Sequence, residues 1–229
     1  MKDLAVIETI LRNRYHFFIE IRDGVRLNEK MRAMLISSIL FLALYGAVLG
    51  STHSLWQTLS SAFKLPVLFL ATLVICSPTL YFFNILFGSN QSLTQNVILI
   101  LTAITVTAVI LLSFAPIVVF FLLTTSNYQF FKLMNVIIFA IASIVGVVFL
   151  SQGMRIVSSA GKEGTRARRW VMWLWVLVYA FVGSQMAWTL RPFIGAPSMQ
   201  FELFRQLGGN FYTNVFASIG EILGFFVVR

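Results

Sequence analysis

Five long apolar segments constrain this sequence more than any other feature. They cover about residues 33–50, 65–87, 96–124, 132–154 and 170–188. The only charged residue inside them is Lys132, at the start of the fourth segment. A helix needs about 20 apolar residues to cross the hydrocarbon core of a bilayer, and these segments approach or exceed that length. We therefore expect an all-α, polytopic membrane helix bundle with five transmembrane helices.

The composition excludes a soluble globular protein. Charged residues make up 11% of the 229 residues and hydrophobic residues 59%, whereas about a quarter of a soluble domain is charged because its surface must be hydrated. We expect three parts, which are a polar N-terminal segment over 1–32, the bundle over 33–190, and a C-terminal segment over 191–229.

The positions of Lys and Arg predict the orientation. The segment before residue 33 is rich in both, and the connection between the fourth and fifth spans carries a second basic group: Arg155, Lys162, Arg166, Arg168 and Arg169. With five spans, a cytoplasmic N-terminus places both basic segments in the cytoplasm, as the positive-inside bias requires. We expect this basic surface to meet anionic lipid headgroups or an acidic partner, and the net charge of +9 therefore does not indicate nucleic-acid binding.

Residues 3–23 predict an amphipathic helix. Apolar side chains recur at helical spacing from Leu4 to Phe18, and Gly24 is a suitable stop. Two interpretations are open, since such a helix can lie in the cytoplasmic interface of the membrane or pack against the cytoplasmic ends of the spans.

The C-terminal segment predicts an interfacial or re-entrant structure. Pro192 and Pro197 break the helix that precedes them, and residues 199–207 predict a short amphipathic helix. Residues 211–228 are long enough for a sixth span, which stays an alternative. However, Asn214 and Glu221 count against it, because a carboxylate near the bilayer centre costs about 2.5 kcal/mol or more.

No arrangement of residues in the sequence predicts catalysis, a metal or a cofactor. Cys76 is the single cysteine, and His16 and His53 are expected on opposite sides of the membrane. The stretch 158–165 lacks the first Gly of a phosphate-binding loop and has Glu163 where such a loop requires Ser or Thr. We therefore expect a protein that is not an enzyme and has no cofactor.

The polar residues within the spans are mainly Ser, Thr, Asn and Gln, which usually hold membrane helices together. A path lined by hydroxyls of the third and fourth spans is the alternative. Pairs of small residues four apart, such as Gly46 with Gly50, Ala142 with Gly146 and Gly220 with Gly224, favour close helix contact within the bundle or between copies.

The densest polar group after the spans is our candidate interaction site: Arg191, Glu202, Arg205, Asn210, Tyr212 and Glu221. Arg191 follows Trp188 closely, and a pair with Glu202 across the Pro-Gly-Pro turn would clamp this segment onto the bundle. The alternative is a docking or ligand site on the outer face.

Residues 188–197, read Trp-Thr-Leu-Arg-Pro-Phe-Ile-Gly-Ala-Pro, are followed by Phe-Glu-Leu-Phe-Arg at 201–205 and Asn-Phe-Tyr at 210–212. This pattern resembles the C-terminal signature of a family of bacterial multi-pass membrane proteins loosely described as Yip1-like. The resemblance covers roughly the last quarter of the chain and implies a bacterial inner-membrane protein that acts through partners and not by catalysis.

Two functions are therefore expected, and the first is preferred over the second. The first is a non-catalytic integral membrane subunit or scaffold that anchors or assembles a larger complex with other membrane protein subunits. The second is a small channel or permease with a hydroxyl-lined path.

Overall fold

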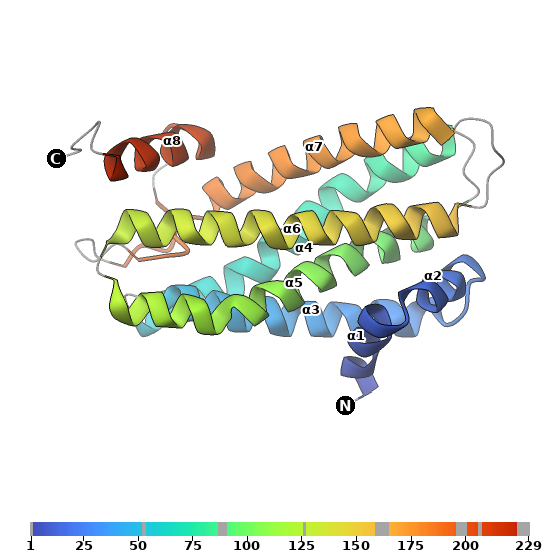
Figure 1. Ribbon diagram of the computed structural model, residues 1–229, viewed down its shortest axis with the longest axis horizontal. Helices are drawn as coiled ribbons and strands as arrows, with labels where there is room; N and C mark the ends of the chain where they lie inside the picture. The colour runs from blue at the N-terminus through green and yellow to red at the C-terminus, as the bar shows by residue number, and fades with distance from the viewer. Residues whose placement is uncertain are drawn as a thin grey trace.

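The computed structural model (Figure 1) describes residues 2–51, 54–86, 91–125, 127–158, 165–195, 201–205 and 208–223. Over these ranges the chain forms eight helices and no strand. The helices are α1 (Lys2–Arg12), α2 (Arg14–Arg22), α3 (Leu27–Gly50), α4 (Leu55–Leu86), α5 (Leu93–Thr124), α6 (Tyr128–Val157), α7 (Thr165–Thr189) and α8 (Phe211–Ile222).

Five of these helices, α3 to α7, are long and apolar enough to cross a membrane. The all-α fold with five candidate spans is thereby confirmed, and the chain has the architecture of a multi-pass membrane protein. Helices α4 and α5 have 32 residues each, or about 48 Å at 1.5 Å per residue. Both therefore exceed the hydrocarbon thickness of about 30 Å and must tilt or project beyond it.

The second span begins ten residues before the predicted start at residue 65, because α4 starts at Leu55 and includes Lys64. Proline at 66 does not end this helix, and Pro78 and Pro116 also lie inside helices. Helix α5 starts at a capping box in which the Ser92 hydroxyl and the backbone N–H groups of Ser92 and Gln95 are all satisfied.

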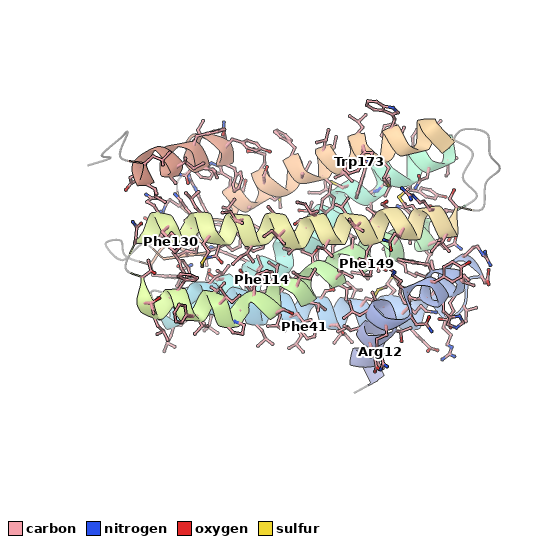
Figure 2. The ribbon with its side chains drawn as sticks, in the orientation of Figure 1. Arg12, Phe41, Phe114, Phe130, Phe149 and Trp173 are labelled. Carbon is pink, nitrogen blue, oxygen red and sulfur yellow. The ribbon has the colours of Figure 1, made fainter. Side chains whose placement is uncertain are left out.

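The bundle has two distinct ends (Figure 1). Helices α1 and α2 lie at one end, which we call the proximal end, together with the starts of α3, α5 and α7. The other, distal end holds the ends of α3, α5 and α7, the starts of α4 and α6, and α8. Apolar side chains such as Trp173 are exposed on the outer surface between the ends, while the charged Arg12 lies at the proximal end (Figure 2).

Helices α3, α4, α5 and α6 form the core, and α7 packs mainly on α4. Close packing depends on the small residues that the sequence indicated. A Cβ added to Gly46 or Gly50 of α3 would overlap backbone atoms of α4, and one added to Gly146 of α6 would overlap α5 at Thr107 and Ala103. These two small-residue pairs thus serve contacts inside the bundle, whereas Gly224 of the third pair lies outside the described residues.

The N-terminal helix is not continuous, because it breaks at Asn13 into α1 and α2. Helix α2 buries Phe17, Phe18 and Ile21 completely and packs on α6 and α5, which confirms packing against the ends of the spans for this half. Gly24, with φ of +75°, ends α2 as expected. Helix α1 packs mainly on α3 and buries Ile10, and its position in the membrane interface stays a prediction.

The C-terminal segment corrects one prediction and confirms another. Residues 201–205 are not helical, so the short helix predicted over 199–207 is wrong in its described part; these residues instead lie against α4. Helix α8 has 12 residues, about 18 Å, which is too short to span. It runs antiparallel to the start of α6, because Asn214 near its start accepts a bond from Lys132 and Glu221 near its end accepts a bond from Gln129, which comes earlier in α6. Over the described residues it is therefore not a sixth span.

Candidate functional site

One face of α4 holds the segment that follows α7. Gln57, Ser61 and Lys64 are spaced by four and three residues, so they lie on the same side of the helix. The Gln57 side-chain amide donates to the carbonyl of Pro192 at 2.9 Å, and the Ser61 hydroxyl donates to the carbonyl of Phe193 at 2.7 Å. These bonds fix residues 192–193, which are not helical, so their carbonyls do not accept the backbone bonds of a helix.

Lys64 completes this attachment. Its ammonium donates to the carbonyl of Leu203 and, at 3.4 Å, to that of Pro192. It also lies 4.9 Å from the centre of the Phe204 ring, within the range of a cation–π contact. The residue is only 4% exposed, so the carbonyls and the ring replace the water that an ammonium normally binds. We call residues 191–195 and 201–205, held in this way, the distal strap.

Arg191, at the start of the distal strap, is oriented by its neighbours. Its guanidinium carbon lies 3.4 Å from the centre of the Trp188 ring, and one terminal nitrogen is 3.5 Å from the Gly208 carbonyl. The Arg191 carbonyl accepts a bond of 3.3 Å from the Arg205 backbone N–H. Burial, followed by repulsion from the Arg205 charge, lowers the pKa of Arg191.

Arg205 lies at the centre of the charged groups. Its guanidinium charge acts on the Tyr128 hydroxyl, on Lys132 and on Arg191, so all three groups lie near it. Glu202 forms its ion pair with Arg205 at 3.6 Å, and its side chain is 48% exposed. A partly exposed pair at this distance contributes little to stability, so Glu202 compensates Arg205 weakly.

The other three predicted site residues hold α8 in place. Asn210 caps α8 by accepting a bond from the Thr213 N–H at 2.9 Å. The Tyr212 hydroxyl lies 3.0 Å from that of Ser184 on α7, and Glu221 accepts a bond of 2.7 Å from the Gln129 amide. The six residues thus form two groups, in which Arg191, Glu202 and Arg205 present charge while Asn210, Tyr212 and Glu221 clamp α8.

Sequence reasoning missed five residues of this region, namely Gln57, Ser61, Lys64, Tyr128 and Lys132. The signal that was present is the single lysine at the predicted entry to two otherwise uncharged spans, since Lys64 precedes the apolar segment 65–87 and Lys132 begins the segment 132–154. The partners of these lysines lie far along the chain, which no local spacing reveals.

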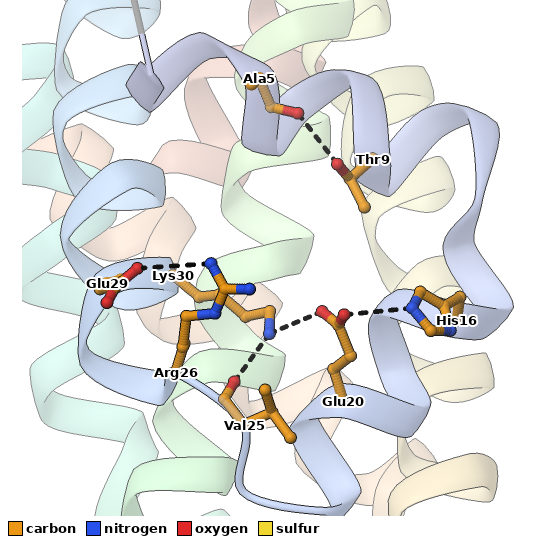
Figure 3. A network of polar contacts seen from close by, with 8 residues as sticks. All are labelled: Ala5, Thr9, His16, Glu20, Val25, Arg26, Glu29 and Lys30. Atoms are coloured by element: carbon orange, nitrogen blue, oxygen red, sulfur yellow. Dashed lines mark hydrogen bonds and ion pairs between the residues drawn. The ribbon is translucent and has the colours of Figure 1, made fainter.

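The predicted basic surface is described only in part. Arg155 is exposed at the end of α6, whereas Lys162 and the side chains of Arg166, Arg168 and Arg169 lie outside the described residues. The proximal end instead shows a polar network around Glu20 (Figure 3). Lys30 contacts the Glu20 carboxylate at 2.8 Å and donates to the Val25 carbonyl at 2.7 Å, while His16 lies 3.1 Å from the other oxygen.

Hydroxyls inside the bundle mostly bond to their own helices. Thr102, Thr105 and Thr107 of α5 each donate to the carbonyl four residues earlier. The buried Tyr45 and Asn135 pair with each other, and Asn84 bonds Asn96 at 3.2 Å. The Tyr45–Asn135 and Asn84–Asn96 bonds join different helices, as expected of a packed bundle.

Two tryptophans of α7 differ in role. Trp173 is exposed, whereas Trp175 is buried and donates to the carbonyl of Cys76 at 3.0 Å, so it fastens α7 to α4. Among the described residues, no three His, Cys, Asp or Glu side chains gather as metal ligands would.

The fold and this site together define a multi-pass α-helical membrane protein with a charged, strapped distal surface. Comparison with protein-family models, with curated proteins and with solved structures finds no match to this chain.

Proposed function

We propose that this chain is a non-catalytic integral membrane subunit that anchors or assembles a larger complex, and that it docks its partner through the distal strap. The observation that carries this proposal is the fixation of a non-helical segment by Gln57, Ser61 and Lys64. A surface already held in one conformation loses little entropy when a partner binds. Charged groups placed on such a surface favour selective recognition.

Two further observations support assembly. The polar groups of the spans are used largely for packing, and the distal strap is a second charged surface besides the proximal end. Helix α7 is also loosely surrounded, with 11% of its most apolar window buried against 33–50% in the other four spans. The resemblance noted for residues 188–197 points the same way, because it implies action through partners. The proposal places the chain in a bacterial inner membrane with its N-terminus on the cytoplasmic side, as the basic segments favour.

Gentle detergent extraction from the native cell, followed by native mass measurement, tests the proposal. We expect a discrete species heavier than the chain, with a fixed ratio of a second protein. The variant Glu202→Lys should reduce that species several-fold, because it reverses a half-exposed charge in the strap. The matched control is Glu8→Lys, an exposed acid at the proximal end. A strictly monomeric chain without co-purifying protein contradicts the proposal.

A further inference from the structure

Cations outnumber carboxylates around Arg205. Lys132 and Arg191 both lie close enough to Arg205 to feel its charge, whereas the acids near these cations are Glu202 and Glu221. Glu221 is bonded to Gln129, and Glu202 is half exposed. Like charges brought together near a bilayer repel strongly, because nearby water is limited. Such a group is stable when an anion joins it.

The geometry of the group suits one class of anion. The charge of Arg205 acts on the Tyr128 hydroxyl, the Lys132 ammonium lies 5.7 Å from the Tyr128 ring centre, and the Arg191 guanidinium carbon lies 3.4 Å from the Trp188 ring centre. The Nε atom of Arg205 is buried and makes no hydrogen bond, since its ion-pair partner, the Glu202 carboxylate, lies 3.6 Å away. Two guanidinium groups, one ammonium and one hydroxyl are the donors that bind phosphate oxygens in proteins, with arginine supplying paired N–H groups.

The depth of the group is also suitable. Tyr128 is the first residue of α6 and Lys132 lies one turn further in, while Trp188 is in the last turn of α7. Tyrosine and tryptophan at the ends of spans mark the membrane interface, which is where lipid phosphates lie. From the charge, the donors and the depth, we propose that Arg205, Lys132, Arg191 and Tyr128 form a binding site for a phosphate anion at the distal membrane surface. This site goes beyond the proposed function, because it requires no partner protein.

Binding to the purified full chain in an uncharged detergent tests the site. The probes are short-chain phosphatidylglycerol, the matched phosphatidylcholine, and inorganic phosphate. Tryptophan fluorescence reports binding, since Trp188 contacts Arg191. We expect saturable binding of phosphatidylglycerol that is at least about tenfold tighter than that of phosphatidylcholine, because the zwitterionic headgroup brings no net charge to the cations.

Variants separate this site from general attraction to a basic protein. Arg205→Gln should weaken phosphatidylglycerol binding about tenfold, which is the loss of one charge-assisted bond. Arg155→Gln, which removes an exposed arginine at the other end of α6, should change it less than about twofold on the same scale. Size-exclusion chromatography checks that each variant is folded. Lys132→Gln gives a second, independent test if Arg205→Gln does not fold.

The outcomes decide both the site and its source. Competition by millimolar inorganic phosphate assigns the site to a soluble phosphate, and lack of competition assigns it to a lipid headgroup. Equal binding of the two lipids overturns the proposal, as does an equal loss of binding in Arg155→Gln and Arg205→Gln. Because no partner protein is present, failure here leaves the assembly function untouched, and failure to find a complex leaves this site untouched.

Discussion

The hydroxyl of Tyr45 on α3 donates a 2.9 Å hydrogen bond to the side-chain oxygen of Asn135 on α6. Both residues are buried, and the Asn135 amide in turn donates to the Phe131 carbonyl at 2.8 Å. This pair links two spans that are not adjacent in the chain. It also gives each polar group a partner in a region without water, which is what a membrane interior demands.

Tyr45→Phe should lower the free energy of unfolding by about 1 kcal/mol, because one interhelical bond is lost and the Asn135 oxygen loses its donor. Unfolding by SDS titration or heat in mixed micelles measures the change. Tyr15→Phe, which alters an exposed tyrosine of α2, is the control and should leave stability unchanged. Equal stability of Tyr45→Phe and the parent chain would show that this bond is not formed.

Gly46→Ala should destabilise the bundle by about 2 kcal/mol, since the added methyl group meets the backbone of α4 at Ser61 and the helices must separate. Gly183→Ala on α7 is the matched control, because its methyl group would lie 3.8 Å from the nearest atom, on Thr72. Thermal unfolding of both variants in detergent compares them. The idea is wrong if the two substitutions have the same effect.

Gln57→Leu should loosen the distal strap, because it removes the bond to the Pro192 carbonyl and leaves that oxygen without its best donor. We expect trypsin to cleave after Arg205 several-fold faster than in the parent chain. Thr58→Val changes the neighbouring residue, whose hydroxyl donates to the Ser54 carbonyl just before α4 at 2.9 Å and not to the strap, and should not alter the cleavage rate. An unchanged rate in Gln57→Leu would contradict the assigned role of α4.

Acid should weaken the attachment of α2 to α3. The hydrogen bond from Lys30 is the main cause that lowers the pKa of Glu20 below its usual range, with Lys30, His16 and Arg26 charges adding to it. A carboxyl group with a lowered folded pKa stabilises the fold above its unfolded pKa of about 4.3, and that contribution disappears as the pH falls through the folded value.

The melting temperature of the parent chain should therefore fall more steeply below about pH 4.3 than that of Glu20→Gln, and the two curves should converge at the lowest pH. Glu29→Gln is the control, since Glu29 is exposed and lies 4.0 Å from Arg26. Parallel curves for the parent and Glu20→Gln would remove this carboxylate as the acid-sensitive group.

The orientation is testable with single cysteines at the two ends of α3. In a Cys76→Ala background, Glu29→Cys and Ser51→Cys place exposed thiols at the proximal and distal ends, respectively. In intact cells, a membrane-impermeant maleimide should label the Ser51 position and spare the Glu29 position until the cells are opened. The reverse pattern would invert the proposed topology.

Much of the fold was predictable from the chain alone. The five spans were found within a few residues at most ends, because each apolar segment is recognised by its own composition. The predicted start of α4 is ten residues late, because Lys64 and Pro66 indicate an entry to the span, whereas both lie inside the helix. The helix expected over 199–207 failed over residues 201–205 because the carbonyls of this segment bond to side chains of α4 and not to its own backbone.

The candidate site was predictable in membership and not in arrangement. Arg191, Glu202 and Arg205 do gather, but Asn210, Tyr212 and Glu221 serve α8, and the pairing of Glu202 is with Arg205, three residues away. Lys132 and Tyr128 belong to the site only because the first turns of α6 pack beside the distal strap. A high density of polar residues in a segment indicates that they form polar contacts, but it does not show which residues contact one another.

The number of spans, their limits and the expected orientation depend on the sequence by itself, because the free energy of placing a segment in a bilayer is set by that segment and its flanking charges. The role of Lys64 was decided by the tertiary structure. Its acceptors lie 128 and 139 residues away in the chain. They are available because the chain after α7 is not helical and returns to α4, so these carbonyls are not used in helical hydrogen bonds. A buried ammonium needs such acceptors, and only the folded chain could bring them to it.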